Sequence, residues 1–233
     1  MASDRPTILI IGASRGLGLA LASEFVRRAW TVIGTVRGAG RTGLHELADG
    51  HGGQVEIETI DINAPDQIAA LRARMEGRTI DMLFVNAGIT TEDQNVHIGA
   101  VSTDAFVDVM ITNALSPMRV IEALQDLVPA DGLIGVMSSG QGSIANNTIG
   151  LREVYRGSKA ALNQFMRSFA AREGDVPRAM LLLAPGWIQT ALGGPQATFT
   201  IEESAPILVD LMIAKRRRPG LEFLNRDGNA VAW

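Results

Sequence analysis

The segment Gly12-Ala13-Ser14-Arg15-Gly16-Leu17-Gly18 lies between an apolar run, Thr7-Ile8-Leu9-Ile10-Ile11, and a stretch of helical periodicity at residues 17–28. This order predicts a buried strand, a tight glycine turn and a helix. Glycines at such a turn let the backbone approach a pyrophosphate, and the helix amino end offers free N–H groups and a positive dipole. Because 25 of the 233 residues are glycine, the cluster alone would also suit a plain turn, but the flanking strand and helix favour a dinucleotide site.

Short apolar runs and longer amphipathic stretches alternate along the whole chain, which is typical of a parallel sheet with helices on both faces. We expect strands at residues 7–11, 31–36, 54–60, 81–86, 132–138, 178–184 and 221–224, and helices at residues 17–28, 64–75, 103–127 and 154–172. No linker or internal repeat divides the chain. The pattern therefore predicts one α/β domain over residues 1–233, with a doubly wound, mostly parallel sheet of about seven strands.

The composition excludes several classes of protein. Hydrophobic residues make up 46% and charged residues 20%, which suits a large core and not a disordered chain. With no cysteine and three scattered histidines, we expect no metal site. The net charge of −4 argues against nucleic acid as a partner, and the basic run at residues 215–218 is interpreted as a solvated helix end. The apolar runs are too short to span a membrane and no secretion signal is evident, so a cytoplasmic protein is expected.

Tyr155, the only tyrosine, stands four residues before Lys159 on a predicted helix, so the two side chains share one face. An ammonium near the phenol would lower its pKa and make proton exchange with a substrate oxygen feasible. In isolation, the pair would more simply be an amphipathic helix with a solvated lysine. However, the predicted strands also end in polar or glycine residues at Asn86-Ala87-Gly88, Ser138-Ser139 and Pro185-Gly186, and the carboxyl ends of parallel strands are where ligands bind.

Together with the glycine loop and Asn113, these motifs resemble the short-chain dehydrogenase/reductase family in order, type and spacing over nearly the full chain. The resemblance implies a Rossmann fold and a catalytic set of Asn113, Ser139, Tyr155 and Lys159. In that set Tyr155 is the general acid or base, Ser139 binds the substrate carbonyl, Lys159 contacts the nicotinamide ribose, and Asn113 holds a water behind Lys159. Ser138 stays an alternative to Ser139, and Asn113 alone would suit a kink before Pro117.

Within the family, the chain is similar to the branch of the C-factor proteins and the sniffer-type carbonyl reductases. The residues that carry this likeness are Tyr155 to Asn163, Pro185 to Thr190, Gly193-Gly194-Pro195, Asp227-Gly228 and Trp233.

The residue that follows the second predicted strand indicates which cofactor binds, because an acid there would bind the ribose 2′-hydroxyl of NAD and repel the 2′-phosphate of NADP. Arg37 stands there instead, and Arg15 lies in the glycine loop, so NADP is favoured over NAD. The cofactor-binding residues implied are Gly12, Ser14, Arg15, Gly16, Leu17, Gly18, Arg37, Asp61, Ile62, Asn86, Ala87, Gly88, Tyr155, Lys159, Pro185, Gly186, Ile188 and Thr190.

Two functions are weighed. The first is an NADP-dependent carbonyl reductase or alcohol dehydrogenase of the EC 1.1.1 type, acting on a small-molecule ketone, aldehyde or alcohol. The second is a regulatory or signalling protein of the C-factor type that binds dinucleotide with little turnover. A substrate loop is expected at about residues 187–203, and an apolar pocket is expected from Ile144, Ile149, Leu151, Trp187, Leu192 and Phe199. Surplus apolar residues on helices 103–127 and 154–172 predict a homodimer or homotetramer.

Overall fold

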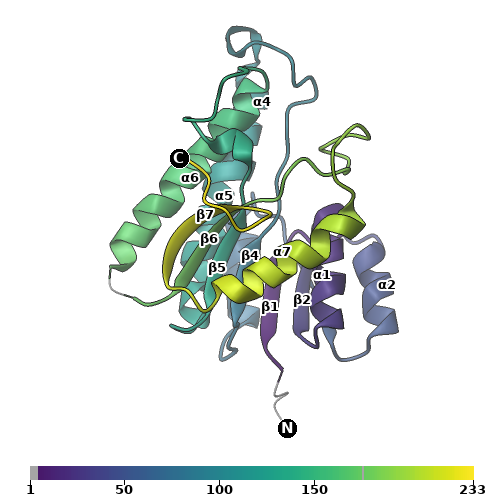
Figure 1. Cartoon of the computed structure of the whole chain (residues 1–233). Helices are drawn as coiled ribbons and strands as arrows, with labels where there is room; N and C mark the ends of the chain where they lie inside the picture. Colours follow the sequence, from purple (N-terminus) through teal and green to yellow (C-terminus); the bar gives the residue numbers. More distant parts are fainter. Residues whose placement is uncertain (1–4, 175) are drawn as a thin grey trace.

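The computed structural model describes residues 5–174 and 176–233, in which the predicted strands align into one sheet (Figure 1). The strands are β1 (Thr7–Ile11), β2 (Thr31–Val36), β3 (Val55–Thr59), β4 (Met82–Val85), β5 (Leu133–Met137), β6 (Ala179–Ala184) and β7 (Gly220–Asn225). They are parallel throughout, in the order β3-β2-β1-β4-β5-β6-β7. The predicted single α/β domain with a seven-stranded parallel sheet is confirmed.

The centre of the sheet positions the site. β1 lies between β2 and β4, and its register places Ile11 opposite Val85. Gly12 and Asn86, the next residues of the two strands, therefore leave the sheet side by side. The connections from β1 and from β4 run over opposite faces, and such a switch point opens a crevice at the carboxyl ends of the strands.

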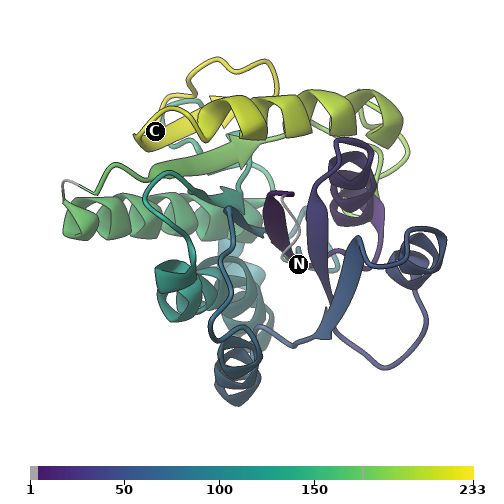
Figure 2. The same ribbon diagram turned by 90° about the horizontal axis from the view of Figure 1, so that it is seen from below.

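The helices form a layer on each face of the sheet (Figure 2). Buried side chains of α1 (Gly16–Arg27), α2 (Gly43–Gly50) and α7 (Ile201–Lys215) join one hydrophobic cluster with the strands. Those of α3 (Pro65–Arg74), α5 (Ser116–Leu124) and α6 (Glu153–Glu173) join the other. Strands β1, β4, β5 and β6 are buried on both faces, as expected for apolar runs in a parallel sheet.

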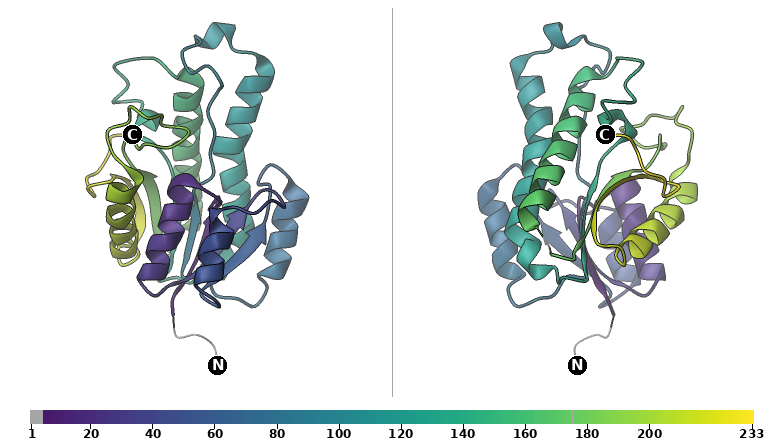
Figure 3. Two further views of the ribbon diagram at one scale, coloured as in Figure 1. Left: turned by 90° about the vertical axis from the view of Figure 1, so that its right-hand side faces the viewer. Right: turned by 60° about the vertical axis from the view of Figure 1, so that its left-hand side comes forward.

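The helix expected at residues 103–127 is interrupted. It consists of α4 (Thr103–Met110), a π-helical turn at Ile111–Leu115, α5, and a 3-10 turn at Gln125–Leu127. α4 and the amino-terminal half of α6 lie side by side and extend beyond the sheet (Figure 3). Single π-helical turns occur frequently at functional sites, and this one contains Asn113.

Two helices were not among those predicted. α2 is a short helix with glycine at both ends, so its apolar pattern is brief. α7 begins directly after Thr200, whose side chain and that of Glu203 form a capping box, and contains Pro206. Because α7 begins at Ile201, residues 201–203 of the expected substrate loop lie in its first turn.

Of the helices described, none is both long and apolar enough to cross a membrane. Nor do three or more metal-ligating side chains come together anywhere in residues 5–174 and 176–233.

Candidate active site

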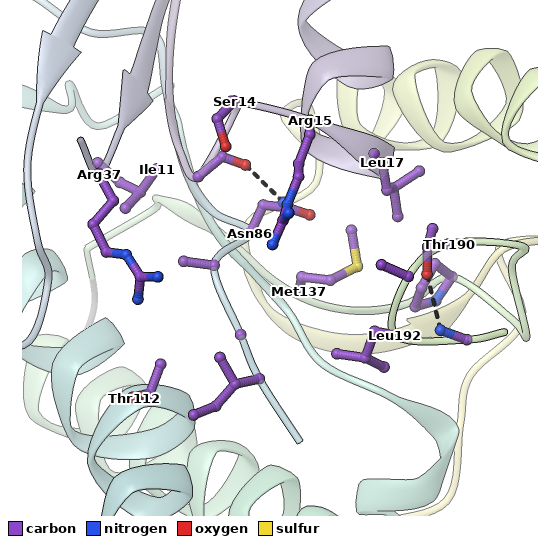
Figure 4. A pocket seen from close by; sticks show the side chains of 18 of the residues that line it. Ile11, Ser14, Arg15, Leu17, Arg37, Asn86, Thr112, Met137, Thr190 and Leu192 are labelled. Atoms are coloured by element: carbon purple, nitrogen blue, oxygen red, sulfur yellow. Dashed lines mark hydrogen bonds between the residues drawn. The ribbon is translucent and has the colours of Figure 1, made fainter. Parts of the chain in front are cut away.

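A cavity of about 1200 Å³ lies at the carboxyl ends of the central strands. Figure 4 shows Arg37 on one side of this pocket and Thr190 and Leu192 on the other, with Asn86 and Met137 between them. Every residue predicted to bind the cofactor lines the cavity except Gly18. Of the expected catalytic residues, Ser139, Tyr155 and Lys159 line it as well, whereas Asn113 lies behind its wall.

Gly18 contributes to the site by leaving space. A Cβ atom at this position would lie 2.0 Å from the backbone oxygen of Gly12 and 2.6 Å from Nδ2 of Asn86. The same Asn86 Nδ2 donates a hydrogen bond of 2.9 Å to that Gly12 oxygen. Gly12 has φ +89°, which favours glycine, and its N–H donates to Oγ1 of Thr35. The glycine loop is thus fixed to both neighbouring strands.

The end of β2 forms the nucleotide end of the cavity. Thr35, Val36 and Arg37 line it without an acid among them, and Arg15 faces the same space. Arg15 and Arg37 are exposed, and neither forms an ion pair with another described residue. A pair of uncompensated guanidinium groups fits a bound phosphate. The arrangement matches the expectation for a nucleotide with a 2′-phosphate.

Tyr155 and Lys159 lie on α6, one turn apart, and both are almost completely buried. The side chain of Ser139, just beyond β5, forms a hydrogen bond with the phenol of Tyr155. The ammonium of Lys159 donates to the backbone oxygen of Met137 at 2.9 Å and lies 5.8 Å from the centroid of the Tyr155 ring. Three of the four expected catalytic residues thus form one cluster on the cavity wall.

The pKa values of this pair differ from the expectation. Burial raises the pKa of Tyr155 above its ordinary value of 10.0, and the hydrogen bond with Ser139 and the charge of Arg152 oppose that increase. Burial also lowers the pKa of Lys159 to about 8. We expected Lys159 to lower the pKa of Tyr155, but burial is the largest influence on this phenol, and the ammonium donates to a carbonyl oxygen of the sheet. The phenol is therefore a neutral proton donor at pH 7.

Asn113 is fully buried in the π-helical turn. Its side chain accepts from the N–H of Ile89 and donates to the oxygen of the same residue, both at 2.8 Å. It also donates to Oγ of Ser158, which lies next to Lys159 in the sequence and donates in turn to the Tyr155 backbone oxygen. Asn113 therefore joins the segment after β4 to α6. A Cβ on Gly88 would be 3.3 Å from Asn113 Oδ1 and 3.4 Å from Lys159 Nζ.

The hydrogen-bond partners of Ser138 and Ser139 indicate which of the two serines could bind the substrate oxygen. Ser138 is buried, and its hydroxyl donates to Oδ1 of Asn163 at 2.6 Å. Ser139 is only partly buried, and its hydroxyl is shared between Tyr155 and the N–H of Gln141. Because Ser139 adjoins the phenol, the geometry favours it as the group that binds the substrate oxygen.

The substrate end of the cavity is less apolar than expected. Trp187 and Leu192 line it, but Ile144, Ile149, Leu151 and Phe199 do not. Ile144 is 77% and Ile149 73% exposed on the segment before α6. Phe199 pairs with Ile188 in a β-bridge within the loop, and the guanidinium of Arg226 lies 3.8 Å from its ring centroid. The loop itself is held by hydrogen bonds from Trp187 Nε1 to the Gly193 oxygen and from Gln189 Nε2 to the Ala197 oxygen.

Several residues of the site were missed in the sequence. Arg41, Gln141 and Arg152 line the cavity, and Asn63 links the end of β3 to the π-helical turn through Thr112 and Ser116. Only Arg152 had a usable signal, because it stands three residues before Tyr155 and immediately precedes the helix that carries it.

The comparisons with known proteins agree with this geometry. A structure from Burkholderia multivorans, described as a short-chain dehydrogenase/reductase with bound NADP, is 63% identical, with a TM-score of 0.97 over 98% of this chain and 100% of that one. A carbonyl reductase from Pseudomonas aeruginosa PAO1 in complex with NADP is 33% identical, with a TM-score of 0.91 over 99% and 100%. The carbonyl reductase Sniffer of Drosophila melanogaster is 29% identical, with a TM-score of 0.89 over 98% and 100%.

These likenesses confirm the resemblance to carbonyl reductases of the sniffer type. The sequence model of the short chain dehydrogenases matches residues 6–199, which include the glycine loop, Tyr155 and Lys159. The chain therefore belongs to the short chain dehydrogenase family.

Proposed function

We propose that this protein is an NADP-dependent oxidoreductase that interconverts a carbonyl compound and its alcohol. The observation that carries the proposal is the contact between the Ser139 hydroxyl and the Tyr155 phenol, beside Lys159, inside a cavity whose far end carries Arg15 and Arg37. A protein that only binds dinucleotide has no need of a proton donor at that place.

The residues of the chain supply binding and a proton. Ser139 donates a hydrogen bond to the substrate carbonyl oxygen and holds it against Tyr155. Tyr155, protonated at neutral pH because it is buried, donates its proton to that oxygen. When bound at this site, NADPH would supply a hydride to the carbonyl carbon, which with the proton from Tyr155 gives the alcohol and leaves NADP⁺. Lys159 would hold the cofactor ribose, and Asn113 positions α6 through Ser158 and would hold a water behind Lys159.

The nucleotide end supports NADP as the cofactor. Arg15 and Arg37 form no ion pairs with other described residues, and no acid follows β2. Two of the similar structures contain NADP. The glycine loop at the amino end of α1 would hold the pyrophosphate.

Steady-state absorbance of the nicotinamide with a panel of ketones and aldehydes tests the proposal. We expect NADPH-dependent reduction of at least one class of carbonyl compound, with NADH much less effective. Micromolar binding of NADPH without turnover of any carbonyl or alcohol would contradict it and favour a regulatory protein of the C-factor type.

We also propose that the chain assembles as a homodimer or homotetramer through α4 and α6. Phe106 and Phe165 on these helices are each 41% exposed, whereas Val120, Leu162, Met166 and Phe169 are buried in the core. Phe106 and Phe165, together with Val107 of α4, are therefore exposed apolar residues that an interface could cover. A sedimentation mass at micromolar concentration near that of the 24.8 kDa monomer would contradict the assembly.

A further inference from the structure

Arg152 is an unpaired cation at the catalytic end of the cavity. It lines the cavity, and its charge acts on the phenol of Tyr155. Within residues 5–174 and 176–233, its guanidinium forms no ion pair or hydrogen bond. The adjacent acid Glu153 is directed elsewhere, because its carboxylate accepts from the N–H of Ile98 and lies 3.6 Å from Nδ1 of His97.

The charges along the cavity are unbalanced. Asp61 is the only carboxylate that lines it among the described residues, against the cations Arg15, Arg37, Arg41, Arg152 and Lys159. The phosphates of a bound NADP would lie at the glycine loop and near Arg15 and Arg37, and Arg41 already pairs with Asp49. Arg152, beside Tyr155, lies at the other end. It would therefore stay unmatched after the cofactor binds.

The backbone at Arg152 is also unusual. Its φ of 61° and ψ of 39° are left-handed, at the residue that precedes α6. The other non-glycine residue described with positive φ, Ala29, follows the end of α1, where this conformation is ordinary. A left-handed arginine costs free energy, and such residues cluster where a side chain must be aimed at a ligand.

A second polar group at this end also lacks a partner. Oε1 of Gln141 is buried without a hydrogen bond to any described residue, and Gln141 lines the same cavity two residues after Ser139. A buried amide oxygen of this kind requires a donor. A hydroxyl or N–H group of a ligand would supply one.

We propose that Arg152 is a specificity-determining residue that binds an anionic group of the substrate, so that the preferred carbonyl compounds carry a carboxylate. This inference rests on the proposed function, since the carboxylate is recognised on a molecule whose carbonyl lies at Tyr155. The proposed substrate site therefore recognises a carboxylate, in place of the apolar pocket that the sequence predicted. Gln141 accepts a hydrogen bond from a donor on the same molecule.

The test compares two aldehydes that differ in charge, 4-carboxybenzaldehyde and methyl 4-formylbenzoate. We expect the wild type to reduce the aldehyde group of 4-carboxybenzaldehyde with a higher kcat/KM than that of methyl 4-formylbenzoate. Asn tolerates the left-handed backbone, so Arg152→Asn should remove the charge with little strain and lower the ratio of the two kcat/KM values by about 10- to 100-fold. Using the ratio cancels any effect of the lost charge on the pKa of Tyr155, which both substrates share.

Two further variants control the comparison. Arg152→Lys should retain part of the preference, because it keeps the charge but loses the planar fork. Arg156→Gln should leave the ratio unchanged, because Arg156 is one turn further along α6, outside the cavity lining, and donates to the Leu151 backbone oxygen. Equal ratios in the wild type and Arg152→Asn would overturn the inference, even with vigorous turnover of both aldehydes.

If neither aldehyde is reduced, calorimetry of benzoate and benzamide with the enzyme and NADP⁺ decides the matter. The inference would be supported, although the proposed reaction had failed, if the wild type bound benzoate more tightly than benzamide and Arg152→Asn did not. No preference for benzoate in the wild type would overturn it.

Discussion

The Lys159 ammonium donates a hydrogen bond of 2.9 Å to the backbone oxygen of Met137, the last residue of β5. This contact places the cation at the carboxyl end of a central strand, immediately behind the Tyr155 ring. α6 is therefore held to the sheet by the same side chain that we propose contacts the cofactor ribose.

The titration of Tyr155 can be observed directly, because it is the only tyrosine in the chain. We expect its phenolate absorbance in the near ultraviolet to develop above pH 10.0 in the folded protein, since burial raises the pKa. Ser139→Ala should shift the titration to still higher pH, because the hydrogen bond from Ser139 lowers the pKa. Spectrophotometric titration of both proteins is the measurement, and a midpoint below 10.0 in the wild type would be inconsistent with the buried phenol.

Lys159 should also give the stability a characteristic pH dependence. Its pKa is about 8 in the folded protein and 10.5 as the ordinary value, so the unfolded chain binds more protons between these pH values. Stability from this group therefore rises with pH from 8 to 10.5, and its unfavourable contribution of about 3 kcal/mol is complete below pH 8. Lys159→Met should therefore have a higher free energy of unfolding than the wild type at pH 7. The lost hydrogen bond to the Met137 oxygen reduces this gain.

Denaturant unfolding of both proteins at several pH values measures this difference. The advantage of Lys159→Met should shrink as the pH rises from 8 towards 10.5. An advantage that stays constant over that range would show that Lys159 is not the group responsible.

Arg37 is expected to select the cofactor. Arg37→Asp removes a charge-assisted contact with a 2′-phosphate and adds repulsion, so NADPH should bind at least about tenfold more weakly. NADH lacks that phosphate and should bind as well as before or better. Fluorescence titration with both nucleotides checks the prediction, and equal losses for the two would exclude Arg37 as the selecting residue.

Gly18 should be irreplaceable on steric grounds. Gly18→Ala would place a Cβ 2.0 Å from the Gly12 oxygen, and we expect a loss of about 1–3 kcal/mol in stability together with weaker NADPH binding. Gly157→Ala is the matched control, because a Cβ there meets nothing within 4 Å and α6 should gain up to about 1 kcal/mol. Thermal unfolding measures both. Similar stabilities for the two variants would contradict the close approach at Gly18.

Much of this architecture could be predicted from local pattern. The buried strands are continuous apolar runs, and the parallel-sheet rule brings their carboxyl ends together, so Gly12, Asn86 and Ser139 were expected at one edge. The helix α7 was missed although its capping box at Thr200 and Glu203 is readable. The signal was masked by the aperiodic, glycine-containing segment that precedes it.

The remaining details depend on tertiary contacts. A local irregularity before Pro117 was predictable, because proline lacks the N–H that would bond to the Asn113 backbone oxygen. Its π-helical form was not predicted, and Asn63 contacts the segment from the end of β3 through Thr112 and Ser116. The exposure of Ile144 and Ile149 follows from the path of an irregular segment, and the freedom of Arg152 depends on Glu153 bonding to Ile98. Such contacts join distant parts of the chain and leave no periodic signal.

The central claim is that Tyr155 passes the proton, and the turnover of Tyr155→Phe tests it most directly. The substitution keeps the ring and its packing but removes the only phenol in the chain. We predict that kcat for a good carbonyl substrate falls by at least about 10²-fold while the dissociation constant of NADPH stays nearly unchanged. Near-normal reduction by Tyr155→Phe would contradict the account, because the proton would then have to come from another group.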